Sequence, residues 1–408
     1  MTHQPVGHQV QLLQGGEVFF EALVQSIDHS AYEVRLETYI FNVHGSGQHV
    51  AASLERAAIR GVAVYLVVDG VGTPALPPDW VDRFNKAGVT WRIFSPLGRL
   101  GLLIPSRWRR LHRKLCVIDG VVAFCGGINV LDDYFDPNHG VLEAPRFDFA
   151  VRVEGPLVQV AHAATVQLWW RLQALRKVRQ SDFPTAWATV QAAVKRVLHP
   201  VKSGSSVAGV RAAARVQGAV AELVLRDNVS NRTRIERAYR KAIGEAQHEI
   251  IIANAYFLPG YKLRKGLIHA AQRGVRVRLL LHGRYEYFMQ YHAARPVYGA
   301  LLAAGVEIHE YSVSFLHAKV AVIDSHWATV GSSNLDPLSL LLAREANVVV
   351  DDETFAKDLR ARLELAFENG GAAVDRANYA NRPWRQRLLD RLAFGLMRVL
   401  LFLNGKRY

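Results

Sequence analysis

One sequence pattern occurs twice in the 408-residue chain, as HRKLCVIDGVVAFCGGIN (His112–Asn129) and as HAKVAVIDSHWATVGSSN (His317–Asn334). In both copies a histidine is followed by lysine two positions later, and then by aspartate at the seventh position, glycine at the fourteenth and asparagine at the seventeenth. Agreement at all of these positions is improbable by chance. The pattern therefore indicates an internal duplication whose copies share one chemistry.

The duplication extends outward from these two segments. AAIRGVAVYLVVDG (Ala57–Gly70) is mirrored by AAQRGVRVRLLLHG (Ala270–Gly283), and EVRLETYIF (Glu33–Phe41) by EIIIANAYF (Glu249–Phe257). The first pair is typical of a helix end, an Arg-Gly stop and a buried strand. We expect each half to run strand, helix, strand, helix, strand. This order predicts an α/β fold with largely parallel strands and helices covering the sheets.

A stretch of different composition separates the halves. It is rich in Ala, Val, Arg and Lys and contains the run SGSS at Ser203–Ser206. We place a first domain at residues 1–175, a basic connection at 176–218, a second domain at 219–380 and a basic, apolar tail at 381–408.

Composition narrows the class of protein and of partner. Half of the residues are hydrophobic (50%), which excludes a disordered chain. The 50 Lys and Arg against 36 Asp and Glu give a net charge of +14, which favours nucleic acid or an anionic membrane as partner. The two cysteines, Cys116 and Cys125, lack metal-ligand spacing, so we expect buried thiols in a reducing compartment.

Neither end of the sequence predicts a segment that spans a membrane. Met1–Glu17 lacks a basic region followed by an apolar one, so no signal peptide or anchor is expected there. Leu388–Leu403 is apolar but is interrupted by Asp390, Arg391 and Arg398. This pattern suits a helix that lies in the membrane interface; a terminal helix docked on the core is the alternative.

The spacing within the duplicated pattern predicts phosphoryl transfer. Residues two apart on a strand share a face, so His112 points with Lys114, and His317 with Lys319. Two such faces would offer two imidazoles and two ammoniums to one phosphate. One imidazole can attack phosphorus while the other, protonated, supplies the leaving alkoxide with its proton and acts as base in the next step. We expect neither a metal nor another cofactor.

The residues around these strands suggest supporting roles. The glycine turns before Asn129 and Asn334 let backbone approach an anion, and both amides are expected to bind phosphoryl oxygens. Asp119 and Asp324 fall an odd number of residues after their lysines, so they should face away from the phosphate and have a supporting role.

Each histidine also needs an acceptor for its second ring nitrogen. Asp148 and Glu345 occupy parallel positions after the two motifs, each at the start of an apolar run. We expect them to orient the histidines, with ordinary surface carboxylates as the alternative.

A loop before the first motif, GRLGLLIPSRWRRLH (Gly98–His112), combines apolar and basic residues. Such a combination suits the rim of an active site that rests on anionic lipid headgroups. Partly buried residues with solvated arginines are the alternative. Trp169, Trp170 and Arg171 form a similar group. The expected rim consists of Leu102, Leu103, Ile104, Arg107, Trp108, Arg109 and Arg110.

The duplicated H-x-K-x4-D pattern with its trailing G-[GS]-x-N resembles the phospholipase D superfamily, from about residue 10 to about residue 385. The strings LETYIF (Leu36–Phe41), ANAYFLPGY (Ala253–Tyr261) and HWATVGSSNLDPLSL (His326–Leu340) are similar to bacterial cardiolipin synthases of class B. The resemblance implies two homologous α/β/α sandwich domains related by a pseudo-twofold axis, with one shared active site.

The resemblance also implies the reaction: transfer of a phosphatidyl group between two phosphatidylglycerols, with release of glycerol and a phosphohistidine intermediate. The family's active-site positions match His112, Lys114, Asp119, His317, Lys319 and Asp324. We expect His112 to be the nucleophile and His317 the acid, although the order could be reversed. A peripheral protein on the cytoplasmic face of a bacterial membrane is implied, and one chain suffices for a complete site.

Two other enzymatic functions share this chemistry. Hydrolysis of phospholipid to phosphatidic acid would use the same catalytic residues. A nucleic-acid phosphodiesterase would also explain the charge, but runs of Leu and Ile are not typical of nucleic-acid grooves, so no nucleic acid is expected. A lipid-binding scaffold without activity is disfavoured because both motifs are intact.

Overall fold

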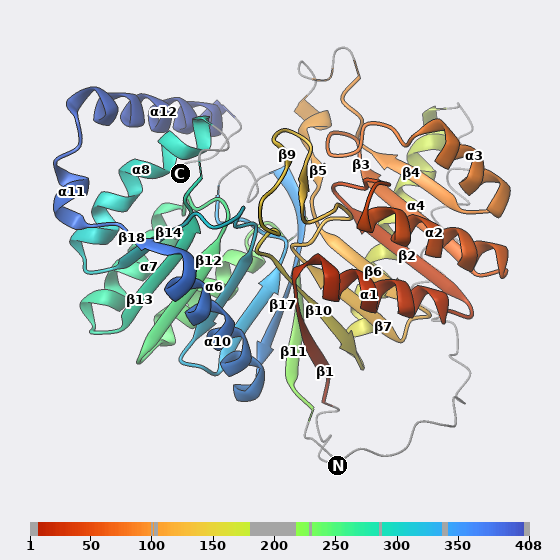
Figure 1. Ribbon diagram of the computed structural model, residues 1–408, viewed down its shortest axis with the longest axis horizontal. Coiled ribbons are helices and arrows are strands. Elements are labelled where there is room, and N and C mark those ends of the chain that lie inside the picture. The colour runs from red at the N-terminus through yellow and green to blue at the C-terminus, as the bar shows by residue number, and fades with distance from the viewer. Residues whose placement is uncertain are drawn as a thin grey trace.

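The structure is a computed structural model that describes residues 7–98, 101, 105–179, 218–227, 231–284, 288–336 and 342–403 (Figure 1). Each half of the chain forms one main sheet. The first sheet has the spatial order β1 (Gln9–Gln14), β10 (Phe149–Glu154), β7 (Val122–Gly126), β6 (Lys114–Ile118), β2 (Glu33–Thr38), β3 (Ala63–Asp69) and β4 (Thr90–Phe94). The second has the order β11 (Val220–Arg226), β17 (Ala343–Asp351), β16 (Trp327–Gly331), β15 (Lys319–Ile323), β12 (Glu249–Asn254), β13 (Arg276–His282), β14 (Glu307–Tyr311) and β18 (Gly371–Ala373).

The expected order of strand, helix, strand, helix, strand is confirmed in both halves. In the first half, β2, β3 and β4 alternate with α2 (Ser46–Ile59) and α3 (Pro78–Ala87). In the second, β12, β13 and β14 alternate with α7 (Tyr261–Gln272) and α8 (Phe288–Ala303). The duplicated sequence thus folds into two equivalent α/β units.

The expectation of largely parallel strands is wrong. Only β2, β3 and β4, and likewise β12, β13 and β14, run parallel within the main order of each sheet. The cause is the duplicated motif itself, which forms a hairpin, β6–β7 or β15–β16. Asp119 and Gly120 have φ of 52° and 65°, and Asp324 and Ser325 both have 51°. Positive φ at both central residues is the geometry of a type I′ turn, a tight turn that joins antiparallel strands.

The two sheets contact each other through one shared apolar core. That core contains Val117 and Val151 of the first sheet together with Val320 and Val348 of the second. Helices cover the outer faces: α1 (Gly15–Asp28), α2 and α3 on the first sheet, and α6 (Arg234–Glu245), α7 and α8 on the second (Figure 1). On the inner side, α4 (Leu157–Arg179) and α10 (Glu353–Gly370) flank the contact between the sheets. Each half is therefore an α/β/α unit.

The connection between the halves lies almost wholly outside the described residues, including Ser203–Ser206. Helix α4 continues to Arg179, four residues beyond the boundary expected at residue 175. The proposed division into domains remains a prediction. Within the described residues, no helix has an apolar stretch long enough to cross a bilayer.

Both cysteines lie in the first sheet, where they are free and buried, as expected. Cys116 is on β6 and Cys125 on β7. Burial raises the pKa of Cys125 to about 12, so its thiol stays protonated at neutral pH. Neither thiol is a candidate nucleophile, because the thiolate is the reactive form.

Candidate active site

Backbone pairing between the halves brings the two motifs together. Strand β5 (Arg110–Leu111) pairs with the start of β17, and His112 N donates to the carbonyl oxygen of Arg344 at 3.1 Å. The equivalent bond in the other direction runs from His317 N to the carbonyl oxygen of Phe147 at 2.9 Å. In both cases the acceptor residue directly precedes a candidate carboxylate. Each histidine is thus set beside the carboxylate of the opposite half.

The side chains complete this crossed arrangement. His112 Nδ1 lies 3.0 Å from Glu345 Oε1, and His317 Nδ1 lies 2.6 Å from Asp148 Oδ2. Glu345 and Asp148 are buried, whereas the histidines retain some exposure. A carboxylate on Nδ1 leaves Nε2 for a substrate and fixes the orientation of the ring. The alternative of ordinary surface carboxylates does not hold.

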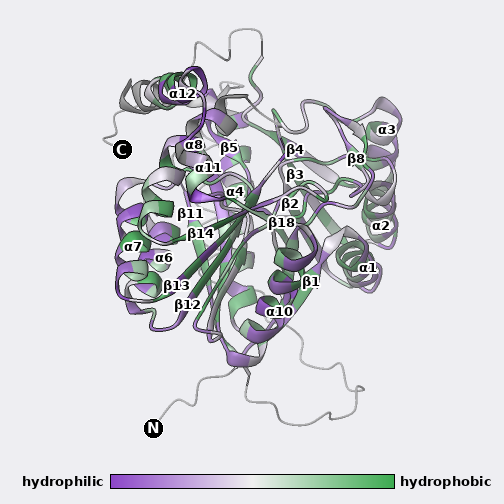
Figure 2. Cartoon of the chain, turned by 60° about the vertical axis from the view of Figure 1, so that its left-hand side comes forward, coloured by the Kyte–Doolittle hydropathy of each residue, from purple (hydrophilic) through white to green (hydrophobic). Residues whose placement is uncertain are grey.

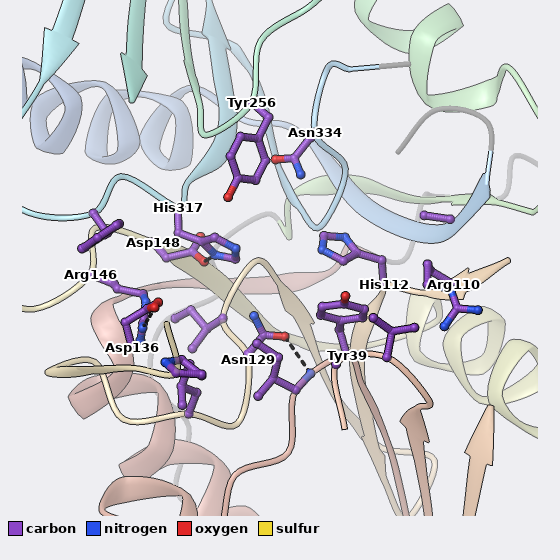
Figure 3. A pocket seen from close by; sticks show the side chains of 18 of the residues that line it. Tyr39, Arg110, His112, Asn129, Asp136, Arg146, Asp148, Tyr256, His317 and Asn334 are labelled. Carbon is purple, nitrogen blue, oxygen red and sulfur yellow. Dashed lines mark hydrogen bonds and ion pairs between the residues drawn. The ribbon is translucent and has the colours of Figure 1, made fainter. Parts of the chain in front are cut away.

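His112 and His317 face one cavity of about 790 Å³ between the halves. Figure 3 shows the two imidazoles opposite each other, with Asn129 and Tyr39 below and Tyr256 and Asn334 above. The wall is partly apolar, with Ile128, Leu131, Phe315, Leu316 and Leu342 among its residues. A cavity of this size and lining can hold a polar headgroup beside an apolar chain.

The two lysines lie behind the histidines. Lys114 and Lys319 are buried, and each ammonium donates to the backbone carbonyl oxygen of the histidine two residues earlier; the Lys114 bond is 2.8 Å. Burial lowers the pKa of Lys114 to about 7, and Glu345 opposes this shift. A bound phosphate would favour the charged ammonium, because opposite charges stabilise each other at low dielectric.

The electrostatics of the Asp148–His317 pair are also set by burial. Burial lowers the pKa of His317 well below 6.5, and Lys319 and Lys114 lower it further. Burial raises the pKa of Asp148 to about 6, although Lys319 opposes this. Burial therefore makes charge on either group costly. A phosphodiester between the histidines carries the negative charge that would favour an imidazolium.

The asparagines frame the cavity. Asn129 Oδ1 accepts from Ile40 N at 3.2 Å, which turns its amide nitrogen toward the cavity (Figure 3). Asn334 lies on the opposite wall. Both positions suit the expected contact with phosphoryl oxygens, which remains a prediction.

The structure does not bring Asp119 and Asp324 to the cavity. The Asp119 carboxylate accepts from the backbone N–H groups of Ala31, Tyr32 and Glu33, all at 2.7–2.8 Å. Asp324 accepts in the same way from Gln247, His248 and Glu249 at 2.8 Å. Each aspartate fixes the turn that precedes β2 or β12. Asp119 and Asp324 therefore have a structural role in the turns. Their position away from the cavity agrees with the expectation that their side chains face away from the phosphate.

The expected membrane rim is only partly described. Leu102, Leu103 and Ile104 lie outside the described residues. Trp108 lines the cavity and Arg109 is exposed, whereas Arg107 donates to the Leu97 carbonyl oxygen at 2.8 Å.

Two of the basic and aromatic side chains expected at a lipid surface point inward instead. Arg110 pairs with the buried Asp69 at 3.1 Å, and Asp69 also accepts from Leu111 N. This contact positions the residue before His112, so Arg110 is a structural cation of the cavity wall. Trp169 is buried against Phe94 and Leu111. The Trp and Arg content of a segment does not show whether these side chains point into the protein or lie on its surface.

The two half-sites differ in the carboxylate that holds the histidine and in the residue beside that carboxylate. Ser332 donates its hydroxyl to Glu345, and the equivalent residue in the first half is Gly127. A Cβ at Gly127 would lie only 2.2 Å from Asp148 Oδ1. The Ser332 hydroxyl thus holds the longer side chain of Glu345. The shorter side chain of Asp148 lies against Gly127, where there is no room for a Cβ atom. Sequence alone does not indicate that these two differences belong together.

Several cavity residues were missed from sequence. Tyr39 directly follows the parallel strand β2, and Tyr256 lies two residues after the parallel strand β12. The ring of Tyr39 meets that of His112 edge-on at 5.1 Å. Their position at the carboxyl ends of parallel strands is a signal that could have identified them. Arg146 binds Asp136 at 2.9 Å and holds the hairpin β8 (Phe135–Asp136) to β9 (Gly140–Val141) as another wall of the cavity.

Chemically, the cavity offers two opposed imidazoles backed by buried cations and amide donors. Within the described residues, no group of three His, Cys, Asp or Glu side chains is close enough to hold a metal ion. The arrangement can transfer a group through a covalent bond to one imidazole, with the other as proton donor and acceptor.

Comparison with known proteins agrees with this chemistry. A family model described as "Cardiolipin synthase, PLD-like domain" matches residues 23–143 and 239–365. Cardiolipin synthase B of Salmonella typhi is 37% identical over 98% of this chain and 90% of its own length. Cardiolipin synthase B of Escherichia coli K12 is 36% identical with the same coverage.

Among solved structures, a phosphatidylserine synthase of Haemophilus influenzae is similar with a TM-score of 0.65 and 12% identity. The match covers 96% of this chain and 94% of the synthase. A polyphosphate kinase of Porphyromonas gingivalis aligns with a TM-score of 0.52 and 12% identity over 88% of this chain and 50% of the kinase. At these identities the likeness establishes the fold alone.

Proposed function

Because the chain belongs to the family of cardiolipin synthases with phospholipase D-like domains, we propose that it joins two phosphatidylglycerols into cardiolipin and glycerol. The observation that carries the proposal is the pair of opposed histidines, His112 and His317, at one cavity, each bonded to a buried carboxylate of the other half.

In the first step, His112 Nε2 attacks the phosphorus of the donor lipid. A P–N bond forms, the bond from phosphorus to the glycerol headgroup breaks, and glycerol leaves with a proton from His317 Nε2. The phosphatidyl group is then bound to His112, and His317 is neutral. Burial and the two lysines favour that neutral form, as the lowered pKa of His317 indicates.

In the second step, the glycerol headgroup of another phosphatidylglycerol enters the cavity. Its hydroxyl gives a proton to His317 and attacks phosphorus, the P–N bond breaks, and cardiolipin leaves. His317 regains the proton that it gave in the first step, so the enzyme returns to its starting state. The phosphate charge supports the imidazolium, which burial alone disfavours.

Other residues supply position and charge. Glu345 and Asp148 hold the rings, Lys114 and Lys319 oppose the negative charge of the transition state, and Asn129 and Asn334 bind phosphoryl oxygens. We further propose that a single chain suffices, because both halves of the crossed arrangement come from it. The protein would work as a peripheral protein on the cytoplasmic face of the membrane.

The proposal is tested by incubating the full chain with phosphatidylglycerol vesicles and identifying lipids by mass spectrometry. Cardiolipin and glycerol are expected from the wild type and from His49→Ala, a variant of an exposed histidine on α2, and neither from His112→Ala. Phosphatidic acid as the sole product would show a hydrolase instead of a transferase. Cleavage of added DNA, without any lipid product, would overturn the proposal.

A second substrate separates the two histidines. In phosphatidyl-p-nitrophenol the leaving group needs little protonation, so the acid becomes dispensable while the nucleophile does not. His317→Ala is expected to release one burst of p-nitrophenol and to retain the phosphatidyl group, whereas His112→Ala releases none. A burst from His112→Ala alone would reverse the two roles.

A further inference from the structure

Helix α12 (Trp384–Leu403) has one face docked on the protein. Asp390 is buried, with His292 Nδ1 at 2.7 Å and the Arg382 guanidinium at 2.8 Å. Ala393 is also buried, and Phe394 packs against the apolar cluster beneath α7 and α8. These contacts fix how the helix is rotated about its own axis.

The opposite face of α12 is apolar and exposed. Four of its large side chains follow one another at intervals of four residues, the spacing of one helical face, and a fifth, Leu389, adjoins them. Their exposed fractions range from 37% to 65%. They are Trp384, Leu388, Leu389, Leu392 and Leu396. We call this set the α12 stripe, and Figure 2 shows hydrophobic and hydrophilic residues together along the helix.

The charges beside the α12 stripe have one sign. Arg385, Arg387 and Arg391 are exposed on the same helix. Asp390 is the single acidic residue in the sequence of α12, and its carboxylate is bound inside the protein by a histidine and an arginine. The outward surface therefore combines large apolar side chains with exposed arginines.

A second apolar group stands at the cavity wall. Val141 is 85% exposed, and Tyr134 and Phe135 are also exposed, around the hairpin β8–β9. The same hairpin contributes Asp136 to the cavity. Figures 1 and 2 both place this hairpin and α12 toward the upper end of the molecule, opposite the N-terminus.

We propose that the α12 stripe docks the protein on an anionic phospholipid bilayer. The leucines and Trp384 would enter the headgroup boundary while the arginines bind lipid phosphates. A second copy of the chain fits less well, because two such faces would bring like charges together. Docking through α12 would turn the end of the molecule with the β8–β9 hairpin toward the membrane. The cavity would then lie near the bilayer, although no described residue of α12 is among those that line the cavity.

This inference rests on the proposed function for the nature of the lipid, and its test separates the two. The central variant is Leu388→Gln with Leu392→Gln. Its matched control is Leu365→Gln, because Leu365 is 57% exposed on α10, a helix that lies apart from α12 (Figure 1). Binding is measured by flotation with vesicles of phosphatidylcholine containing phosphatidylglycerol, and with vesicles of phosphatidylcholine alone.

The wild type and Leu365→Gln are expected to bind the anionic vesicles, and the double variant to bind at least about tenfold more weakly. Arg385→Gln with Arg387→Gln and Arg391→Gln forms a second variant that keeps the apolar face. Its binding should fall by about fivefold per arginine at low salt and lose most of its salt dependence. This variant decides the question if the first one fails to fold.

Two results would overturn the inference: binding of both variants as tight as that of the wild type, or equal binding to neutral and anionic vesicles. A wild-type dimer that the leucine variant abolishes, without vesicle binding, would assign the face to a second copy instead. Glycerol release from monomeric short-chain phosphatidylglycerol needs no surface and reports on the proposed function. Its absence in the wild type, with vesicle binding intact, would refute the reaction and leave the docking surface standing.

Discussion

Replacing Asp148 by asparagine should make the protein more stable at neutral pH and nearly inactive. Asp148 is 3% exposed, and burial raises its pKa from the ordinary 3.8 to about 6. An acid with a raised pKa in the folded state loses stability as the pH rises through the window between its unfolded and folded values. A pKa shift of about two units lowers the unfolding free energy of the wild type by ~3 kcal/mol at pH 7. The variant does not have this loss, because its amide has no proton to release.

Activity should change in the opposite direction. The Asp148 carboxylate is bonded to His317 Nδ1 at 2.6 Å. Loss of this charge-assisted hydrogen bond is worth ~1.5–3 kcal/mol, or a fall in turnover of roughly 10- to 150-fold. An asparagine that donates to Nδ1 would also leave Nε2 with the proton and favour the wrong ring tautomer.

The assay is urea denaturation of wild type and variant at pH 4 and pH 7, with cardiolipin formation followed at pH 7. The two proteins should differ little at pH 4, and the variant should be more stable by ~1–3 kcal/mol at pH 7, since its amide needs new partners. A stability difference that is independent of pH, or full activity in the variant, would refute the reasoning.

Three further substitutions test other parts of the site. Asp324→Asn weakens an acceptor whose pKa is lowered by the backbone N–H groups of the β12 turn. The substitution should cost about 1 kcal/mol of stability at pH 7, and less as the pH falls. Denaturation and activity assays in parallel should show unchanged turnover per folded molecule. Gly127→Ala places a Cβ 2.2 Å from Asp148 Oδ1, so turnover should fall at least about tenfold, measured by lipid mass spectrometry. Ser332→Ala removes one donor to Glu345 and should lower turnover only about threefold to tenfold in the same assay; a larger loss than that of Gly127→Ala would contradict the packing argument.

The position of Asp119 away from the cavity could be predicted from sequence, but for the wrong reason. Strand parity does not apply, because His112 precedes β6 and Asp119 lies in the hairpin turn after it, with a positive φ of 52°. Lys114 lies behind His112, bonded to its backbone carbonyl oxygen. The hairpin was missed, although the Asp119–Gly120 pair is a strong signal for one. Alternation of helices and strands describes β2 to β4 correctly but contains no information on the direction of β6 and β7.

The remaining part of the site depends on contacts between distant residues. Whether Arg110 lies on a lipid surface or in a buried ion pair depends on Asp69, forty-one residues earlier in the chain. The same holds for α12, for which the sequence left interfacial and docked positions open. Asp390 interrupts the apolar run there, and only its contacts with His292 and Arg382 show that the charge faces inward and the leucines outward.

The crossed pairing explains why a duplicated domain needs both copies. A histidine paired with the carboxylate of its own half would leave each half able to orient its imidazole alone. In this chain, His112 reaches Glu345 and His317 reaches Asp148 only when β5 pairs with β17 and Phe147 pairs with Leu316. Contact between the two sheets therefore both buries the shared core and brings together His112 and His317, the proposed nucleophile and acid. Any change that separates the sheets should disable both histidines together, before either half unfolds.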